Sequence, residues 1–329
     1  MDEEAIVGEV LPIAQCARNN GGLVIAQVER LLEAPAPPHA VVIPGVLIDH
    51  VVVAPREDGQ HDQTFGERFN PAYCSARGGD GDGGGGGGGG AQLPAALEGK
   101  RRTIAARACD ELREGDVVNL GIGIPEGVGI VAAERGVLDS VCLTIESGPV
   151  GGLPASGLSF GASAFPDAIL SQPEMFDSYD GGWLDLAALG AAQIDYAGNV
   201  NVSRFGDTVA GLGGFVNISQ AAKRLVFCCN FDAGSGASKF VPQVEQRSFS
   251  ARRAAAVGTN VLYVTERCVL KLQAQQDAAL DADGFPRTRL ELREVALGFE
   301  VEDVLRALGQ GEGSGVSVAE ELKTGCVWS

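Results

Sequence analysis

Histidine is scarce in this chain of 329 residues: it has three, His39, His50 and His61, and none lies further along the chain. Histidine is the usual general base near neutral pH and the commonest metal ligand. The sequence "GLSFG" at 157–161 matches the Gly-x-Ser-x-Gly pattern of α/β-hydrolases, in which a histidine follows the serine. Because no histidine follows Ser159, we interpret this segment as a glycine-lined turn. Chemistry in the later chain must therefore use carboxylates, hydroxyls and backbone groups, and we predict no metal site.

Basic residues are also few, since 25 lysines and arginines face 43 aspartates and glutamates and give a net charge of −18. This balance argues against broad binding of nucleic acid or anionic membranes, which needs clustered cations. The shortage of basic residues is not uniform along the chain. Between 204 and 253 they outnumber the acidic residues, which are Asp207, Asp232 and Glu245. A local excess of this kind suits a small polyanion such as a phosphorylated cofactor, although scattered solvated side chains explain it equally well. The basic residues are Arg204, Lys223, Arg224, Lys239, Arg247, Arg252 and Arg253.

The sequence lacks a Cys-x-x-Cys pair, and several of its eight cysteines lie in apolar runs such as "RLVFCCNF". This usage is typical of a reducing compartment in which cysteines serve as small core residues. The most apolar stretch, at 40–55, is interrupted by Pro44, Asp49 and His50, so it does not fit a membrane span. We predict a soluble, intracellular protein that is cytoplasmic on this sequence, and organellar targeting of a longer product stays open.

Three regions differ in composition. Residues 78–97 begin with "GGDGDGGGGGGGGAQ", which has nothing to bury and predicts a glycine-rich linker or insertion. Residues 1–77 hold few helix signals and two β-branched runs, "GGLVIAQVERLL" and "AVVIPGVLIDHVVVA". In residues 98–329 strand and helix patterns alternate, which predicts an α/β domain with a mainly parallel open sheet flanked by helices.

Several elements of that domain are predicted directly. Residues 99–115 carry Ile104, Ala105, Ala108 and Leu112 at helical spacing. Further helices are predicted at 125–136 and in "EVEDVLRAL", and strands in "DVVNLGIGI", "SVCLTIE", "LDLAALGAAQIDYAGNVNVS", "AAKRLVFCCNF" and "NVLYVTERCVLKL".

The sequence "TIESGPVGGLP" at 144–154 places Glu146 where an apolar strand ends in a turn rich in glycine and proline. In open α/β sheets, ligands bind at the carboxyl ends of strands, where Glu146 is expected. A single glutamate there is more often structural than catalytic. A desolvated glutamate supplied with an oxyanion hole can, however, act as a covalent nucleophile.

Two further glycine loops lie in the same region. In "GIGIPEG" at 121–127, Glu126 stands where a dinucleotide-binding loop has its third glycine, so a nicotinamide site is weakly indicated. The backbone N–H groups of such a turn can hold an anion, but from this motif alone we favour a tight strand-to-helix turn. "GLGGF" at 211–215 either brings a substrate close to backbone N–H groups, as an oxyanion hole requires, or forms an ordinary bulge.

Taken in order, these segments resemble the acyl-CoA:carboxylate CoA-transferases of the glutamate-thioester class, especially the single-chain propionate and acetate enzymes. The resemblance implies that 1–77 is the C-terminal remnant of a first domain that is mostly missing. It also implies that 98–329 is the second domain, which carries the catalytic glutamate. The motifs are "NLGIGIPEGV", "ESGPVGGLPASGLSFGAS", "FDSYDGGWLDLAALGAAQID", "GNVNVSRFG", "GLGGFVNISQAAKRLVF", "KFVPQVEQRSFS" and "YVTERCV", preceded by "NNGGLVIAQVERL", "IPGVLIDHVVVA" and "NPAYC".

The resemblance also implies roles for individual residues. Glu146 is the nucleophile, and the backbone N–H groups of Gly213 or Gly214 stabilise the oxyanion. Coenzyme A is a substrate of a ping-pong reaction, and no permanently bound cofactor or metal is expected. The expected CoA-binding residues are Asn119, Gly121, Gly123 and Lys223.

The implied substrates are short-chain acyl-CoA and small carboxylic acids of the acetate, propionate or acetoacetate type, as in short-chain fatty acid and ketone body metabolism. The implied assembly is a homo-oligomer or a chain that depends on the missing first domain. Two alternatives stay open: an acyl-CoA hydrolase that uses the same Glu146, and an inactive CoA-binding fragment. A sugar-phosphate isomerase of similar α/β pattern leaves the "ESGPVGG" turn unexplained.

Overall fold

The computed structural model describes residues 4–55, 60–75, 97–234, 236–275, 280–309 and 315–328. The chain forms two compact units. Unit 1 comprises Met1–Gln92 and Thr144–Asp177, and unit 2 comprises Leu93–Leu143 and Ser178–Ser329. The predicted linker at 78–97 lies outside the described residues except for Leu97. The predicted division at this linker therefore stays a prediction.

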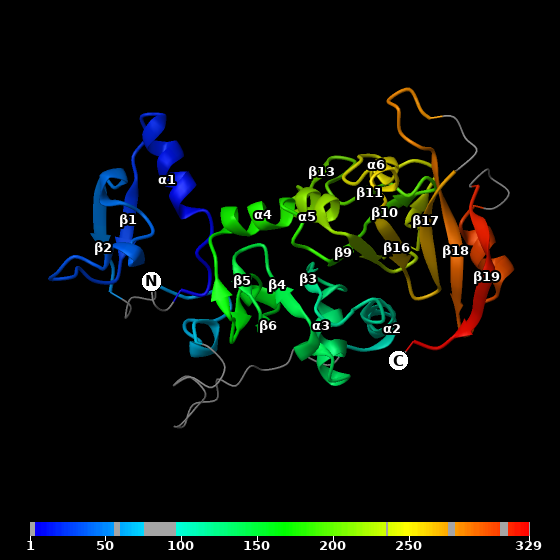
Figure 1. Cartoon of the computed structure of the whole chain (residues 1–329), viewed down its shortest axis with the longest axis horizontal. Coiled ribbons are helices and arrows are strands. Elements are labelled where there is room, and N and C mark those ends of the chain that lie inside the picture. Colours follow the sequence, from blue (N-terminus) through cyan, green and yellow to red (C-terminus); the bar gives the residue numbers. More distant parts are fainter. Residues whose placement is uncertain are drawn as a thin grey trace. The chain divides into compact units, whose positions relative to one another are not determined.

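Unit 2 is built on a mixed sheet whose strand order is β19-β18-β17-β16-β14-β9-β3-β4 (Figure 1). Its centre is parallel, because β3 pairs with β9, β9 with β14 and β14 with β16 in the same direction. β17 then runs antiparallel to both β16 and β18, and β19 is parallel to β18. The strands are β3 (Val117–Leu120), β4 (Cys142–Thr144), β9 (Leu186–Gly190), β14 (Arg224–Cys228), β16 (Asn260–Val264), β17 (Cys268–Ala274), β18 (Thr288–Ala296) and β19 (Ser317–Cys326).

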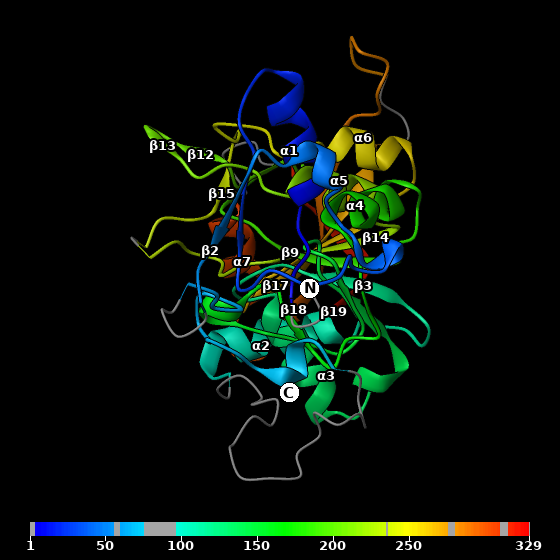
Figure 2. The same ribbon diagram turned by 90° about the vertical axis from the view of Figure 1, so that its left-hand side faces the viewer.

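Helices cover both faces of this sheet. Figures 1 and 2 agree that α2 (Gly99–Cys109) and α3 (Glu126–Glu134) lie on one face, with α5 (Phe215–Ala221) and α6 (Ala251–Ala256) on the other. A Cβ atom on Gly127 would lie 2.3 Å from Leu97 Cδ1, so glycine lets α3 pack closely against its neighbours. The predicted α/β fold is confirmed, with a sheet that is flanked by helices and is mixed, and that is parallel at its centre from β3 to β16.

Shorter elements complete unit 2. Ile194 of β10 contributes a fully buried side chain to the core. The elements are α7 (Val301–Ala307), β10 (Gln193–Asp195), β11 (Val200–Asn201) and β15 (Phe240–Val241) of a second sheet, and the hairpin of β12 (Arg204–Phe205) and β13 (Thr208–Val209). α4 (Gln172–Asp180) begins in unit 1 and ends in unit 2.

Unit 1 combines early and later segments of the chain. Its core holds Ala5, Ala72 and Tyr73 together with Ala162 and Ala164. Its elements are α1 (Val10–Asn19), the parallel pair β1 (Ile25–Val28) and β2 (His50–Val53), the strands β5 (Pro149–Val150), β6 (Leu153–Pro154), β7 (Ser163–Ala164) and β8 (Ala168–Ile169), and the 3₁₀ turns η1 (Pro38–Ala40), η2 (Gly45–Leu47), η4 (Pro71–Tyr73) and η6 (Gly157–Ser159).

Two local predictions for unit 1 need correction. The strand run predicted over 40–54 is shorter, because a 3₁₀ turn at Gly45–Leu47 follows Pro44 and the strand is confined to His50–Val53. The helix Val10–Asn19 was not predicted at all.

One expectation about the cysteines is met in the described residues. Cys228, Cys229 and Cys268 are buried thiols, as their apolar surroundings predict. No described helix is both long enough and apolar enough to cross a membrane.

Candidate functional site: a glutamate turn braced by two loops

Glu146 lies in a tight reversal between β4 and β5. The N–H of Gly148 donates to the carbonyl of Ile145 at 3.0 Å, and the N–H of Ile145 donates to the carbonyl of Pro149 at 3.0 Å. Glu146 and Ser147 are the two central residues of this turn, and both side chains are half-buried. The sequence pattern predicted this position at the end of a strand.

The glycines of "ESGPVGG" are needed because a second segment passes directly over the turn. Gly148 has φ +135°, and a Cβ atom there would lie 2.1 Å from the carbonyl oxygen of Leu170. The N–H of Leu170 donates back to the Gly148 carbonyl at 3.0 Å. Gly152 has φ +73°, and its Cβ atom would lie 2.2 Å from the Ala164 carbonyl oxygen. Any side chain at these two positions would push the segments apart.

Two serines brace the same pair of segments in opposite directions. Ser147 Oγ donates to the Gly161 carbonyl at 2.5 Å, and Ser163 Oγ donates to the Gly151 carbonyl at 2.8 Å. The N–H of Ala155 adds a backbone bond to the Ala162 carbonyl at 2.9 Å. Ser147 was not among the predicted site residues, although a hydroxyl beside a candidate nucleophile in a glycine turn is a usable signal.

Ser159 also helps to hold these segments together. It lies in the glycine-lined turn that was predicted for "GLSFG" because no histidine follows it in the chain. It ends η6, and its Oγ lies 2.9 Å from Thr64 Oγ1 and 3.4 Å from Glu67 Oε2. Tyr73 packs nearby, where burial and a hydrogen bond from its hydroxyl to Glu67 raise its pKa to about 12. Tyr73 therefore stays neutral at physiological pH, and the cluster is a set of hydrogen bonds rather than an acid–base pair.

The other predicted site residues lie in unit 2, and Asn119 is the most buried of them. It is fully buried on β3, with Nδ2 3.4 Å from the hydroxyl of Tyr179. Gly121 follows β3 and donates its N–H to the Ala188 carbonyl at 2.8 Å. A Cβ atom on Gly121 would lie 3.3 Å from Leu189 Cδ2, so close packing explains this glycine.

The "GIGIPEG" turn is held by its own glutamate. Gly123 is exposed with φ +86°, and its backbone N–H hydrogen-bonds the Glu126 carboxylate. Burial raises the pKa of Glu126, and this hydrogen bond offsets part of the effect. Glu126 thus stabilises the turn that leads into α3.

The "GLGGF" loop is open to solvent. Gly213 is exposed with φ +52°, and no heavy atom lies within 4 Å of the position of a Cβ atom. Gly214 is the N-cap of α5, and the N–H of Phe215 donates to the Leu212 carbonyl at 3.1 Å. The geometry thus leaves room for a ligand beside Gly213.

Lys223 is exposed at the start of β14 and contacts a carboxylate. Its Nζ lies 2.8 Å from Asp185 Oδ1, while Asp185 Oδ2 accepts the N–H of Val117 at 3.0 Å. The candidate residues therefore divide between the units: Glu146 belongs to unit 1 and the others to unit 2. Their roles remain predictions.

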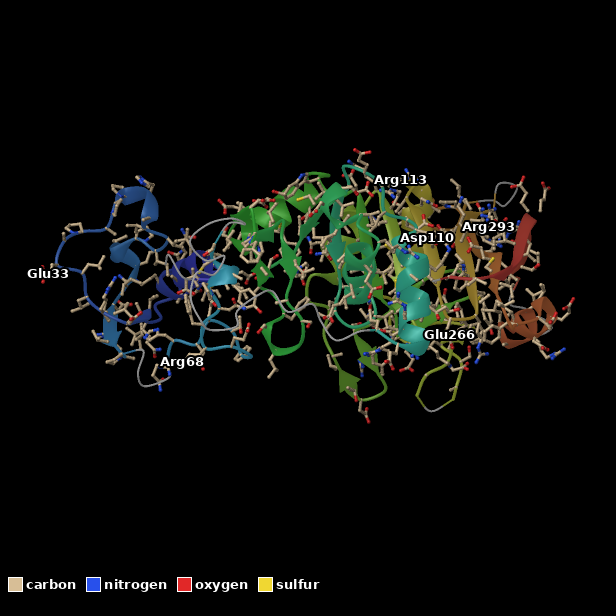
Figure 3. All side chains as sticks on the ribbon, turned by 90° about the horizontal axis from the view of Figure 1, so that it is seen from below. Glu33, Arg68, Asp110, Arg113, Glu266 and Arg293 are labelled. Carbon is tan, nitrogen blue, oxygen red and sulfur yellow. The ribbon has the colours of Figure 1, made fainter. Side chains whose placement is uncertain are left out.

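One buried carboxylate follows the carboxyl end of β16, and its two oxygens accept hydrogen bonds from other parts of unit 2. Glu266 is 5% exposed and accepts the N–H of Phe231 at 2.8 Å and Lys100 Nζ at 2.9 Å. Figure 3 shows it beside the start of α2, with Asp110 at the other end of the helix. Burial acts to raise the pKa of Glu266, but these hydrogen bonds outweigh it and the pKa is lowered. Among the described residues no His, Cys, Asp or Glu cluster fits a metal ion.

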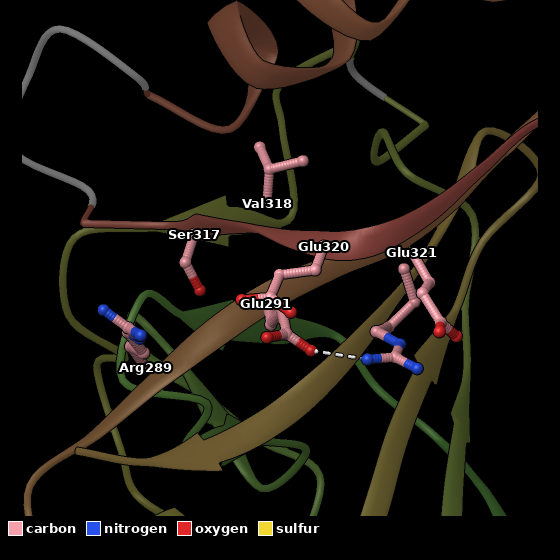
Figure 4. A pocket seen from close by; sticks show the side chains of 7 residues that line it. Arg289, Glu291, Ser317, Val318, Glu320 and Glu321 are labelled. Atoms are coloured by element: carbon pink, nitrogen blue, oxygen red, sulfur yellow. Dashed lines mark hydrogen bonds and ion pairs between the residues drawn. The ribbon is translucent and has the colours of Figure 1, made fainter. Parts of the chain in front are cut away.

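A surface pocket of about 390 Å³ lies along β18 and β19 (Figure 4). Its lining has mixed charge, and Arg293 Nη1 lies 3.0 Å from Glu291 Oε2 within it. The lining residues are Arg289, Glu291, Arg293, Ser317, Val318, Glu320 and Glu321. None of the predicted site residues is among them.

Residues 101–229 match the model of the family described as coenzyme A transferase. The caffeate CoA-transferase of Acetobacterium woodii is 40% identical over 293 residues, which cover 82% of this chain and 54% of that protein. The acetate CoA-transferase subunit beta of Haemophilus influenzae is 30% identical over 53% of this chain and 83% of its own length. The chain belongs to the coenzyme A transferase family.

Solved structures agree with this assignment. Two are of the acyl-CoA transferase YdiF from Escherichia coli O157:H7, one as the apoenzyme and one as a thioester complex with CoA. They are 32% and 31% identical to this chain, both with a TM-score of 0.79, and cover 98% of it. The decarboxylase AibA/AibB, at 19% identity and a TM-score of 0.52, shares the fold. The chain covers 59% of the YdiF apoenzyme and spans about half the length of the curated relatives it matches first.

Proposed function

We propose that this protein transfers CoA from an acyl-CoA to a carboxylic acid through a thioester on Glu146. The Glu146 carboxylate attacks the acyl carbonyl, which gives a mixed anhydride and releases the CoA thiolate. The thiolate then attacks the glutamyl carbonyl, so that CoA is held on Glu146 and the first acid leaves as its carboxylate. An incoming carboxylate attacks the thioester and repeats these steps in reverse, which forms the new acyl-CoA and restores Glu146.

The placement of Glu146 carries this proposal. A glutamate at the centre of a rigid turn offers the carboxylate that such a mechanism needs, in a chain whose later part has no histidine. Family membership and the thioester complex of YdiF support the same chemistry. Oxyanion stabilisation by Gly213 or Gly214 and CoA binding by Asn119, Gly121, Gly123 and Lys223 belong to this proposal. The reaction conserves the thioester and therefore needs no redox cofactor.

The acids are a further part of this proposal, and the relatives name acetate and caffeate among theirs. We take acetate and propionate as first candidates, with acetoacetate as a third. The 40% identity to a caffeate CoA-transferase favours adding an aromatic acid to the set that is tested.

We also propose that full activity requires a second CoA-transferase half. Parallel sheets normally have both faces covered, yet the pair β1–β2 is largely exposed. Ile25 is 62% exposed and Val51, Val52 and Val53 are 51%, 49% and 48% exposed. Relatives that are about twice as long, or that are named as a beta subunit, support a partner half on this surface. This half would come from the same or another polypeptide.

Borohydride trapping tests the nucleophile. The chain, alone and with a partner half supplied, is incubated with acetyl-CoA or propionyl-CoA, reduced with borohydride and measured by intact-mass spectrometry and peptide mapping. A glutamyl-CoA thioester is reduced to an alcohol, so we expect the changed residue at 146 and no change in Glu146→Ala. Glu174→Gln is the matched control, because Glu174 accepts the Ser171 N–H at 2.9 Å in the same unit and glutamine keeps an acceptor.

The other outcomes separate the alternatives. Release of CoA into buffer at the rate of its transfer to acetate or caffeate would favour an acyl-CoA hydrolase. CoA binding that survives Glu146→Ala, with no adduct in the native chain even after a partner half is supplied, would favour a non-catalytic binding protein.

A further inference from the structure

Ser147 connects the glutamate turn to a distant part of unit 1. Its Oγ donates to the Gly161 carbonyl at 2.5 Å, fourteen residues further along the chain. Glu146 and Ser147 together form the centre of the turn, so this bond ties the centre of the turn to the segment around Gly161. Backbone bonds between Ile145 and Gly148 and between Ile145 and Pro149 also close the turn.

The acceptor of this bond is itself held in place. Gly161 has φ +104°, and a Cβ atom there would lie 3.0 Å from Ile6 Cδ1 and 3.4 Å from Ser147 Oγ. Gly161 therefore fits between Ile6 and Ser147 because it lacks a side chain.

Early residues of the chain hold the loop on both sides of Gly161. Ser159 Oγ hydrogen-bonds with Thr64 Oγ1 at 2.9 Å on one side. On the other side, the N–H of Phe165 donates to the Ala72 carbonyl at 2.6 Å, and Phe165 adopts φ +55°. A non-glycine residue keeps such a φ only where its surroundings enforce it. The loop is thus a fixed support for the Ser147 hydroxyl.

We propose that Ser147 is a positioning residue that holds the Glu146 carboxylate in its attacking orientation. The inference rests on the proposed function. Attack on a carbonyl requires the nucleophile to be held within a fraction of an ångström, and a displacement of about 1 Å can lower a rate about a hundredfold. Ser147 acts through the backbone of the turn and makes no contact with the substrate in this role.

The test compares Ser147→Ala and Ser147→Thr with Ser163→Ala. Ser163 is a matched control, because its buried hydroxyl makes the equivalent bond to Gly151 at 2.8 Å between the same two segments. The rate of borohydride-trapped adduct formation at Glu146 is measured against acyl-CoA concentration. For Ser147→Ala we expect the maximal rate to fall about tenfold to a hundredfold with an unchanged half-saturating concentration.

The variants must then separate positioning from stability. We expect Ser147→Thr, which keeps a hydroxyl, to restore most of the rate. We expect Ser163→Ala to lower the urea midpoint of unfolding as much as Ser147→Ala while it keeps the wild-type rate. An equal loss of rate in Ser163→Ala, or no loss in Ser147→Ala, would overturn the proposal.

A second readout does not depend on turnover. In protein labelled with ¹³C at the glutamate carboxyl carbons, Glu146→Gln identifies the Glu146 resonance. We expect this resonance to move in Ser147→Ala, to return in Ser147→Thr and to stay in Ser163→Ala. An unmoved resonance in Ser147→Ala would refute positioning. A further outcome is that the resonance behaves as expected while the wild-type chain, with a partner half supplied, forms no adduct at Glu146. In that case the proposed function is wrong, but the structural support of the Glu146 carboxylate by Ser147 remains.

Discussion

Arg107 and Glu294 form a bidentate ion pair that fastens α2 to β18. Arg107 Nε and Nη2 each lie 2.8 Å from a different oxygen of the Glu294 carboxylate, and Nη1 lies 2.7 Å from Glu111. Arg107 is 8% exposed, so water screens these charges poorly. The two residues are 187 positions apart, which makes the pair a tie between the early and late parts of unit 2.

Removing one partner of this pair should destabilise the fold. Arg107→Met leaves two carboxylates without their cation in a buried site, and we expect a loss of about 3–5 kcal/mol in the free energy of unfolding. The matched control is Arg306→Met, which breaks an exposed pair with Asp303 and should cost less than about 1 kcal/mol. Urea titration followed by far-UV circular dichroism measures both. An equal loss in the free energy of unfolding for both variants would show that the buried pair contributes no more to stability than the exposed pair.

The same carboxylate predicts how stability depends on pH. Burial acts to raise the pKa of Glu294, but the hydrogen bonds and charge of Arg107 outweigh it and hold the pKa below that of an ordinary glutamate. The stability contributed by Glu294 is therefore present above the unfolded-state pKa and is lost as pH falls through the folded-state pKa. We expect the free energy of unfolding to decline below about pH 4.5, and less steeply in Arg107→Met. A decline that is equally steep in the variant would assign it to other groups.

Gly148 offers a test of how tightly the glutamate turn is packed. Gly148→Ala places a Cβ atom against the Leu170 carbonyl at a positive φ, and we expect a cost of about 3 kcal/mol or more. Gly157→Ala is the control in the same unit, because Gly157 also has a positive φ but open space around it, and its cost should be about 1 kcal/mol. Hydrogen exchange of peptides from 144–177 would report the difference. Similar exchange in both variants would mean that the segments can separate freely.

The local pattern of the sequence was enough to predict much of unit 2. Helical spacing predicted α2, and the apolar run before the glycine turn predicted β3. The helix α1 was not predicted, and it contains Pro12, a residue that usually interrupts helices. Pro12 lies in the first turn, where its missing N–H removes no hydrogen bond. The strand β18 was also missed, although the buried Leu290 and Leu292 alternate with charged residues.

The environment of Glu146 could not be predicted in the same way. Its position at a strand end follows from neighbouring residues, but its support depends on contacts such as Ser159 with Thr64, which are 95 positions apart. Local patterns carry no information on such pairs. The grouping of Thr144–Asp177 with the N-terminal segments has the same long-range origin.

The Lys223–Asp185 pair gives a test of the proposed CoA contact. Lys223 Nζ lies 2.8 Å from Asp185, so a CoA phosphate would compete with this carboxylate for the ammonium group. Asp185→Asn keeps an acceptor for the Val117 N–H and removes the competing charge. If Lys223 binds phosphate, Asp185→Asn should tighten CoA binding about fivefold and Lys223→Met should weaken it by a similar factor, which corresponds to about 1 kcal/mol.

Isothermal titration calorimetry with CoA and with dephospho-CoA measures these affinities. Lys271→Met is the control, since Lys271 lies on β17 and has no predicted role. Both effects should weaken as salt is raised, because exposed charges are screened over about 10 Å at 0.1 M. Unchanged affinity in both Asp185→Asn and Lys223→Met would remove Lys223 from the CoA site. Its ion pair with Asp185 would then serve only to join the starts of β9 and β14, where Arg224 pairs with Leu186 in the parallel register.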